Sequence, residues 1–232
     1  MLKSASAIAL LLANVLPAAG VLFWGWEAFY VVFLYWFENL IVGAFNILRM
    51  ISASPGPRDQ VAGSSPTASL IGAHAAKVFM VPFFTVHYGM FCLVHGVFVF
   101  ALFGRESGTI TPPPGHRGGL FSGVFGAIDE VVTPEVLLCL VGLIISHGYS
   151  FLANYLGKGE YKTTPLPALM MRPYPRIVVI HIAILFGAFI SMSFGSPIGI
   201  MLLLIALKTI LDLILHEREH RKAQERLAAS TV

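Results

Sequence analysis

Among the ionisable side chains inside long apolar stretches of this sequence, where a charge is costly to hold, three are expected near one depth. They are Glu38, His87 and His147. Hydrocarbon cannot solvate such groups, so each one is a functional hypothesis by default. Two imidazoles and one carboxylate are typical ligands of zinc, iron or manganese, and three protein ligands leave coordination positions open for chemistry. The residue types therefore predict an intramembrane metal site.

The depth of these residues along their expected helices agrees with that prediction. At about 1.5 Å per residue from the cytoplasmic helix end, Glu38 lies roughly 18 Å deep and the two histidines roughly 15 Å. All three then share one level near the bilayer midplane. His95 lies about 12 Å nearer the outer surface, and His181 lies nearer the inner surface, so both are secondary candidates as ligands.

Polar residues at helical spacing accompany two of the three candidates. Tyr35 and Asn39 lie within one turn of Glu38, and Ser150 and Asn154 follow His147 by three and seven residues. Residues so spaced share a helix face and would hold metal ligands in orientation through hydrogen bonds.

Two other interpretations of the same residues stay open. One is a structural hydrogen-bond network, which is common in membrane bundles. The other is a path for protons or ions, because relays use Glu and His chains. The sequence has no compact metal signature such as HExxH or CxxC. The metal hypothesis therefore depends on matched depth, with zinc, iron or manganese as the expected ion and haem as an alternative.

The composition predicts the kind of protein that positions these residues. Of the 232 residues, 56% are hydrophobic and 12% are charged, whereas soluble domains carry about 25% charged residues. The mean hydropathy is +0.79. Cys92 and Cys139 both fall in apolar stretches and form no disulfide framework. We therefore expect an integral membrane protein.

A spanning helix needs about 20 mostly apolar residues, and the chain has about six such stretches. They lie at 4–23, 28–49, 77–103, 134–156, 176–194 and 197–215. The prediction is one all-α domain over residues 1–215, a polytopic transmembrane helical bundle, followed by a charged cytoplasmic tail at 216–232. The first stretch also fits a cleaved signal peptide, but its apolar run continues to Phe23, which favours an uncleaved helix.

The distribution of Lys and Arg predicts the orientation. With six spans and the N-terminus inside, 13 of the 15 basic residues fall on the inner side, and only Arg105 and Arg117 fall outside. Cytoplasmic loops carry such an excess, so both termini are expected in the cytoplasm. This sidedness explains the net positive charge of the chain, so nucleic acid is not an expected partner.

Three further features outside or at the ends of the spans carry expectations. Residues at helical spacing from Phe121 to Ile128 predict a short interfacial helix in the outer loop. Arg172 and Arg176 are expected at the inner surface, within reach of lipid phosphates. Lys208 and Asp212 are four residues apart on the last helix and are expected to neutralise one another.

Three stretches resemble a bacterial family of polytopic membrane proteins that is catalogued only as a domain of unknown function. They are Leu34-Tyr35-Trp36-Phe37-Glu38-Asn39, His87-Tyr88-Gly89-Met90-Phe91-Cys92-Leu93-Val94-His95-Gly96 and Ser146-His147-Gly148-Tyr149-Ser150-Phe151. The resemblance extends over most of the chain. It implies a bacterial inner-membrane protein and supplies no activity or site residue.

Three functional hypotheses follow from these observations. The first is a metal-dependent membrane enzyme acting on a lipid-like substrate that reaches Glu38, His87 and His147 from the bilayer. The second is an ion- or proton-coupled transporter with Glu38 as the carrier. The third is a membrane scaffold with a purely structural polar network. The expected partners are membrane lipids and a second copy of the chain or another membrane protein.

Overall fold

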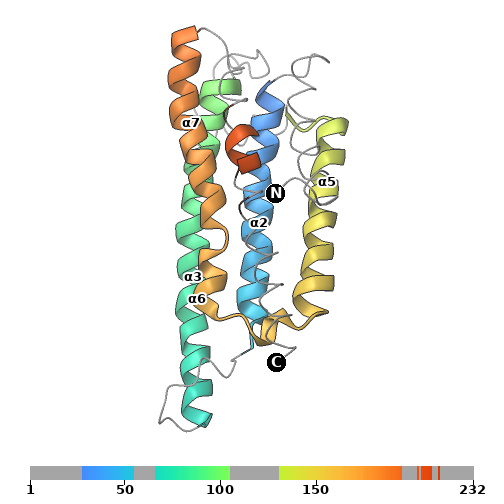
Figure 1. Ribbon diagram of the computed structural model, residues 1–232, viewed down its shortest axis with the longest axis vertical. Coiled ribbons are helices and arrows are strands. Elements are labelled where there is room, and N and C mark those ends of the chain that lie inside the picture. Colours follow the sequence, from blue (N-terminus) through green and yellow to red (C-terminus); the bar gives the residue numbers. More distant parts are fainter. Residues whose placement is uncertain are drawn as a thin grey trace, which may run out of the picture.

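The computed structural model describes residues 28–54, 66–104, 131–194, 203, 205–210 and 214, and within these ranges all regular structure is helical. Figure 1 shows the helices running side by side as a bundle. The elements are α2 (Ala28–Ser52), α3 (Pro66–Val99), η2 (Phe100–Gly104), α5 (Pro134–Tyr149), η3 (Ser150–Leu156), η4 (Glu160–Lys162), α6 (Leu166–Met171) and α7 (Tyr174–Phe194). The π-helical segments η2 and η3 directly continue α3 and α5, and residues 205–210 are also helical.

Four helical stretches are long and apolar enough to cross a membrane: Phe29–Ser52, His74–Leu102, Val136–Leu156 and Leu166–Phe186. They confirm the helices predicted at 28–49, 77–103 and 134–156, and α7 confirms the helix predicted at 176–194. The predicted span at 4–23, the outer-loop helix and the tail at 216–232 lie outside the described residues. A total of six spans and the sidedness of the termini therefore stay predictions.

Helix α2 is the central helix of the described bundle. Figure 1 shows it between α5 on one side and α3, α6 and α7 on the other. In the most apolar 18-residue stretch of each span, 56% is buried for α2, 39% for α3 and 11% for the span that begins in α5. A polar residue on α2 therefore meets other helices in most directions, whereas one on α5 meets them in few.

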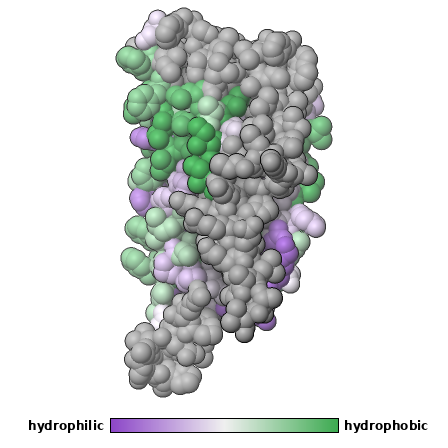
Figure 2. Space-filling model, in the orientation of Figure 1, coloured by the Kyte–Doolittle hydropathy of each residue, from purple (hydrophilic) through white to green (hydrophobic). Residues whose placement is uncertain are grey.

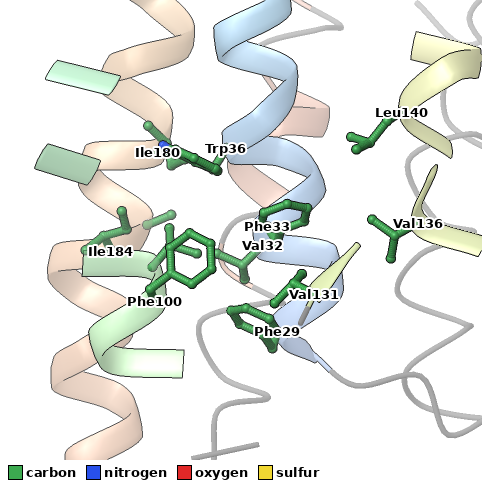
Figure 3. Packing of buried hydrophobic residues seen from close by; sticks show 12 residues of the cluster. Phe29, Val32, Phe33, Trp36, Phe100, Val131, Val136, Leu140, Ile180 and Ile184 are labelled. Atoms are coloured by element: carbon green, nitrogen blue, oxygen red, sulfur yellow. The ribbon is translucent and has the colours of Figure 1, made fainter. Parts of the chain in front are cut away.

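Aromatic side chains fill the space around the first half of α2 (Figure 3). Phe29, Phe33 and Trp36 all contact Phe100 edge-on, with ring centroids 5.8–5.9 Å apart. Aromatic pairs favour such arrangements because the ring edges are positive and the faces negative. Ile180 and Ile184 of α7 complete this cluster and hold α7 against α2.

Two glycines allow α2 and α3 to approach closely. A Cβ on Gly96 of α3 would lie 2.6 Å from the indole of Trp36, and one on Gly43 of α2 would lie 2.5 Å from the ring of Tyr88. The same indole donates a hydrogen bond to the carbonyl of Cys92 at 2.7 Å. Small residues facing large ones are how membrane helices gain contact area without a hydrophobic driving force.

The outward surfaces of the helices are apolar. Figure 2 shows hydrophobic side chains gathered over the upper part of one flank and hydrophilic ones lower down. Large exposed apolar residues occur on α3, α5 and α7, among them Val78, Phe79, Leu138, Ile145 and Phe189. Contiguous exposed apolar surface of this kind marks contact with lipid or another protein.

Candidate functional site

Glu38 is the centre of a cluster of charges that four separate elements supply. It lies in the middle of α2, and only 11% of its side chain is exposed. Arg176 of α7 donates to its Oε1 at 2.8 Å, and Lys208 of the 205–210 helix donates to its Oε2 at 2.9 Å. His147 of α5 approaches Oε1 at 3.5 Å. We call these four residues the Glu38 centre.

The Glu38 centre carries more positive than negative charge. One carboxylate faces one guanidinium and one ammonium, so the three groups sum to +1 when His147 is neutral. Charge-assisted hydrogen bonds like these are short and about twice as strong as neutral ones. A buried pair stabilises only when attraction exceeds the loss of hydration, and here one carboxylate serves two cations.

Aromatic rings hold two members of the centre in place. The ammonium of Lys208 lies 4.0 Å from the ring centroid of Tyr35, one turn before Glu38 on α2. The electron-rich face of a ring attracts a cation at this distance. The imidazole of His147 stacks on Phe45, two turns after Glu38, with centroids 6.4 Å apart. Both rings belong to α2, so this helix orients partners from two other elements.

Arg176 reaches Glu38 because the α6–α7 stretch is a broken helix that enters the bundle early. The apolar stretch begins at Leu166, ten residues before Arg176. The expectation that Arg172 and Arg176 lie at the inner surface stays a prediction, and the described partner of Arg176 is Glu38. Pro173 lacks an N–H group and lies in the turn between α6 and α7, where the helix is interrupted without the chain leaving the bundle.

Asn46 supplies a side-chain donor in place of a backbone N–H that is missing at this break. In a continuous helix the carbonyl of Leu169 would accept from the N–H of residue 173, which is proline. The Nδ2 of Asn46 donates to that carbonyl at 3.0 Å, and the N–H of Arg172 approaches it at 3.2 Å. Asn46 is 1% exposed. Its role is therefore to hold the broken helix against α2.

His87 does not join the Glu38 centre. Its imidazole contacts the rings of Phe83 and Phe91 on its own helix, with centroids 5.2 and 5.1 Å away, and Tyr174 of α7 at 6.0 Å. It also lines an apolar hollow of about 520 Å³ on α3, between Val78 and Met90. The three predicted metal ligands therefore do not meet: Glu38 and His147 come together and His87 faces elsewhere.

The two secondary candidates, His95 and His181, lie against one another. Nδ1 of His95 is 2.6 Å from the carbonyl of Phe91, and its Nε2 is 3.1 Å from Nδ1 of His181. A carbonyl only accepts, so Nδ1 of His95 carries a hydrogen and its Nε2 accepts from His181 when both rings are neutral. This pair joins α3 to α7 and is separate from the Glu38 centre.

The polar residues expected to orient ligands have mixed placements. Tyr35 lies under Lys208, and the amide of Asn39 donates to the carbonyl of Tyr35 at 2.8 Å. The Tyr88 hydroxyl donates to the Asn39 carbonyl at 3.1 Å. Ser150 caps the end of α5, and Asn154 accepts a backbone bond from Lys158 within the following turn. Among these four, Tyr35 lies against the charged group of Lys208, and the backbone N–H of Ser150 donates to the backbone carbonyl of His147.

Arg176 and Lys208 are the functional residues that sequence reasoning assigned elsewhere. The spacing of Lys208 and Asp212 predicts a pair between them, but Asp212 lies outside the described residues and the described partner of Lys208 is Glu38. A signal was present, because a carboxylate deep in an apolar helix needs a cation and few basic residues fall inside apolar stretches. Arg176 and Lys208 lie 138 and 170 residues from Glu38, so spacing alone could not pair them with it.

Comparison with known proteins places the chain in a family. Residues 1–229 match the family of unknown function DUF6498. The chain belongs to this family. No curated protein and no solved structure matches it. DUF6498 carries no assigned activity, so the chemistry has to be argued from the Glu38 centre itself.

The part of the chain that the structure describes gives no support to a metal site in this DUF6498 protein. No group of three or more His, Cys, Asp or Glu side chains in the described ranges is placed to hold an ion. Both oxygens of Glu38 already accept from cationic side chains. Those cations would repel a metal ion, and an arrangement with this charge attracts anions instead.

Proposed function

We propose that this protein is a multi-pass protein of the bacterial inner membrane, with both termini cytoplasmic, and that it is a proton- or ion-coupled transporter. Four membrane-length apolar helices and the sidedness of the basic residues support the location. Glu38 is the proposed carrier group. The supporting observation is that Arg176 and Lys208 converge on this buried carboxylate from two other elements.

A carboxylate in this position can work as a switch between two charge states. When Glu38 is ionised it holds α2, α7 and the 205–210 helix together through two ion pairs. When it is protonated, both pairs weaken and the two cations lose their counter-charge. A helix arrangement held by such pairs has two states, and protonation selects between them. His147, 3.5 Å from Oε1, is the imidazole beside Glu38 and the proposed group for exchanging the proton.

Residual access distinguishes this proposal from a purely structural network. Glu38 is 11% exposed, but His147 and Lys208 are each 21% and Arg176 is 29% exposed. Interior networks that only stabilise a fold are best when every group is sealed and matched in charge. The broken helix beside the centre supports the same function, because interrupted helices in transporters lie at the substrate site.

Reconstituted full-length protein tests the proposal. A pH-sensitive dye inside proteoliposomes reports proton movement after an imposed pH gradient or membrane potential. Flux is expected with the natural chain and with His87→Gln, and it is expected to be abolished in Glu38→Gln. Thermal unfolding in detergent verifies that each variant is folded. Equal flux in the natural chain and a folded Glu38→Gln variant would refute a carrier role and favour the structural network.

A further inference from the structure

We propose that the Glu38 centre also takes an oxyanion, a carboxylate or a phosphate, which bridges Arg176 and Lys208 in the place that the Glu38 carboxylate occupies. The anion enters when Glu38 is protonated, so that proton and anion bind together. This inference rests on the proposed function and names its co-substrate. Its elements are the bridging geometry, the balance of charge and the access to the two cations.

The bridging geometry is that of a carboxylate held between two different donors. Each oxygen of Glu38 has its own cation, Nη1 of Arg176 at 2.8 Å and Nζ of Lys208 at 2.9 Å. Nothing in this arrangement requires the carboxylate to belong to the chain. Guanidinium and ammonium groups so spaced are a general receptor for any anion with two neighbouring oxygens. Glu38 is thus the internal occupant of this position, and a free oxyanion that takes it requires the Glu38 side chain to move aside.

The balance of charge couples the anion to the proton. With Glu38 ionised, the carboxylate, Arg176 and Lys208 sum to +1, and the two cations already have an anion. With Glu38 protonated the sum rises to +2, and one monovalent oxyanion restores +1. The charged or titratable groups that the described elements bring against Glu38 are His147 from α5, Arg176 from α7 and Lys208 from the 205–210 helix. Proton and anion therefore favour one another's binding by the same free energy.

The two cations are accessible enough to receive an anion. Arg176 and Lys208 are 29% and 21% exposed, against 11% for the carboxylate between them. Arg176 uses one of its five N–H donors toward Glu38, and no other described residue hydrogen-bonds to either cation. The Tyr35 ring under Lys208 holds the ammonium without occupying it as an anion would. Donors therefore remain for a second occupant.

Anion binding to the full-length protein in neutral phosphatidylcholine nanodiscs provides the test. Acetate and inorganic phosphate are titrated by calorimetry at acidic and alkaline pH, with proton release or uptake measured in the same experiment. The expected affinity is high in acid and falls by about tenfold per pH unit above the titration of Glu38, with one proton taken up per anion. Glu38→Gln, which is permanently uncharged, is expected to bind the ionised form of the anion with the same affinity at both pH values, after the anion's own protonation is subtracted.

Matched variants decide whether the two cations form the site. Arg176→Gln and Lys208→Met are expected to abolish binding, and Arg172→Gln, an exposed arginine four residues earlier, is expected to leave it unchanged. If Arg176→Gln does not fold, Arg176→Lys keeps the charge and is expected to weaken binding. Asp212→Asn removes the acidic residue four positions after Lys208 and is expected to leave binding unchanged; loss of pH dependence in that variant would overturn the assignment to Glu38.

The same measurements identify the source of the oxyanion and show when the inference is wrong. Retention of anionic lipid by the natural chain but not by Arg176→Gln, with no binding of acetate or phosphate, would support the site and identify a lipid headgroup as its occupant. Absence of all three anions, or binding that Glu38→Gln does not make independent of pH, would overturn the inference. Proton flux that still depends on Glu38 would then leave the proposed function intact.

Discussion

Glu38 on α2 and His87 on α3 are predicted at nearly the same depth, but they have opposite surroundings. Glu38 contacts charged or titratable residues from three other elements. His87 contacts mainly aromatic rings and borders an apolar hollow on the outer side of its helix. Depth follows from counting residues, but direction around the helix axis depends on which neighbours the helix packs against. The central position of α2 is what converts its polar residues into a site.

The largest expected difference between these two positions concerns stability. Glu38→Ala leaves Arg176 and Lys208 without their counter-charge and is expected to destabilise the protein by about 3 kcal/mol. His87→Ala removes only partly exposed ring contacts and is expected to cost about 1 kcal/mol. Denaturant unfolding in detergent micelles measures both. Equal losses would show that the two residues are embedded alike.

Removing one of the two cations together with Glu38 sharpens this comparison. Lys208→Met in the Glu38→Ala background takes away one uncompensated charge. The double variant is therefore expected to be more stable than the sum of the single losses by about 1–3 kcal/mol. Additive losses would mean that Glu38 and Lys208 do not interact in the folded protein.

Two of the glycines of α3, Gly89 and Gly96, extend the comparison to packing. Gly96→Ala forces a methyl group against Trp36, whereas Gly89→Ala meets nothing within 4 Å. Both changes alter the helix propensity equally, so the difference between them isolates the clash. We expect Gly96→Ala to be less stable than Gly89→Ala by about 2 kcal/mol, measured by thermal unfolding. Equal stability would show that α2 and α3 separate easily here.

Asn46 of α2 and Thr85 of α3 are two polar positions whose substitutions can be compared. Asn46→Leu deprives the Leu169 carbonyl of its side-chain donor and is expected to cost about 1 kcal/mol. Thr85→Val removes an exposed hydroxyl that bonds only within its own helix, at 2.8 Å to Val81, and is expected to change stability by less than about 0.5 kcal/mol. Unchanged stability of Asn46→Leu would show that the broken helix does not depend on the hydrogen bond from Asn46.

The smallest expected effect concerns Lys77, a polar side chain of α3 that reaches the end of α2. The ammonium of Lys77 donates to the carbonyls of Ile51 and Ala53. Lys77→Met is expected to weaken the last turn of α2 by about 0.5 kcal/mol. Hydrogen exchange of the amides near residue 52 should accelerate, and Lys162→Met, a change in the exposed η4 turn, should leave these amides unaffected.

Much of the fold could be predicted because its signals are local. Four spans follow from apolar length, and the start of α5 follows from Thr133, whose hydroxyl accepts from the Val136 N–H at 3.4 Å, and Pro134. The early entry of the span before Arg176 could not be predicted in this way. Its first residues, from Leu166, are interrupted by Arg172 and Pro173, which break a run of apolar residues although the chain stays in the bundle.

The candidate site was predictable in its centre and not in its composition. Glu38 and His147 stand out because they are ionisable residues in apolar helices, and they do meet at 3.5 Å. The metal ligand set with His87 assumed that equal depth implies contact. Rotation about the helix axis separates residues at one depth by up to the full width of a bundle, so this assumption has no physical basis without the packing.

The sequence by itself determined that the chain forms long apolar helices and that a few ionisable groups are held within them, because hydropathy and span length are properties of each segment alone. Only the tertiary structure decided which of those groups face one another. It set the rotation of α2 and α3 through their glycine contacts, and it brought Arg176 and Lys208 to Glu38 from 138 and 170 residues away. Helix rotation depends on side-chain packing between segments, which no single segment encodes.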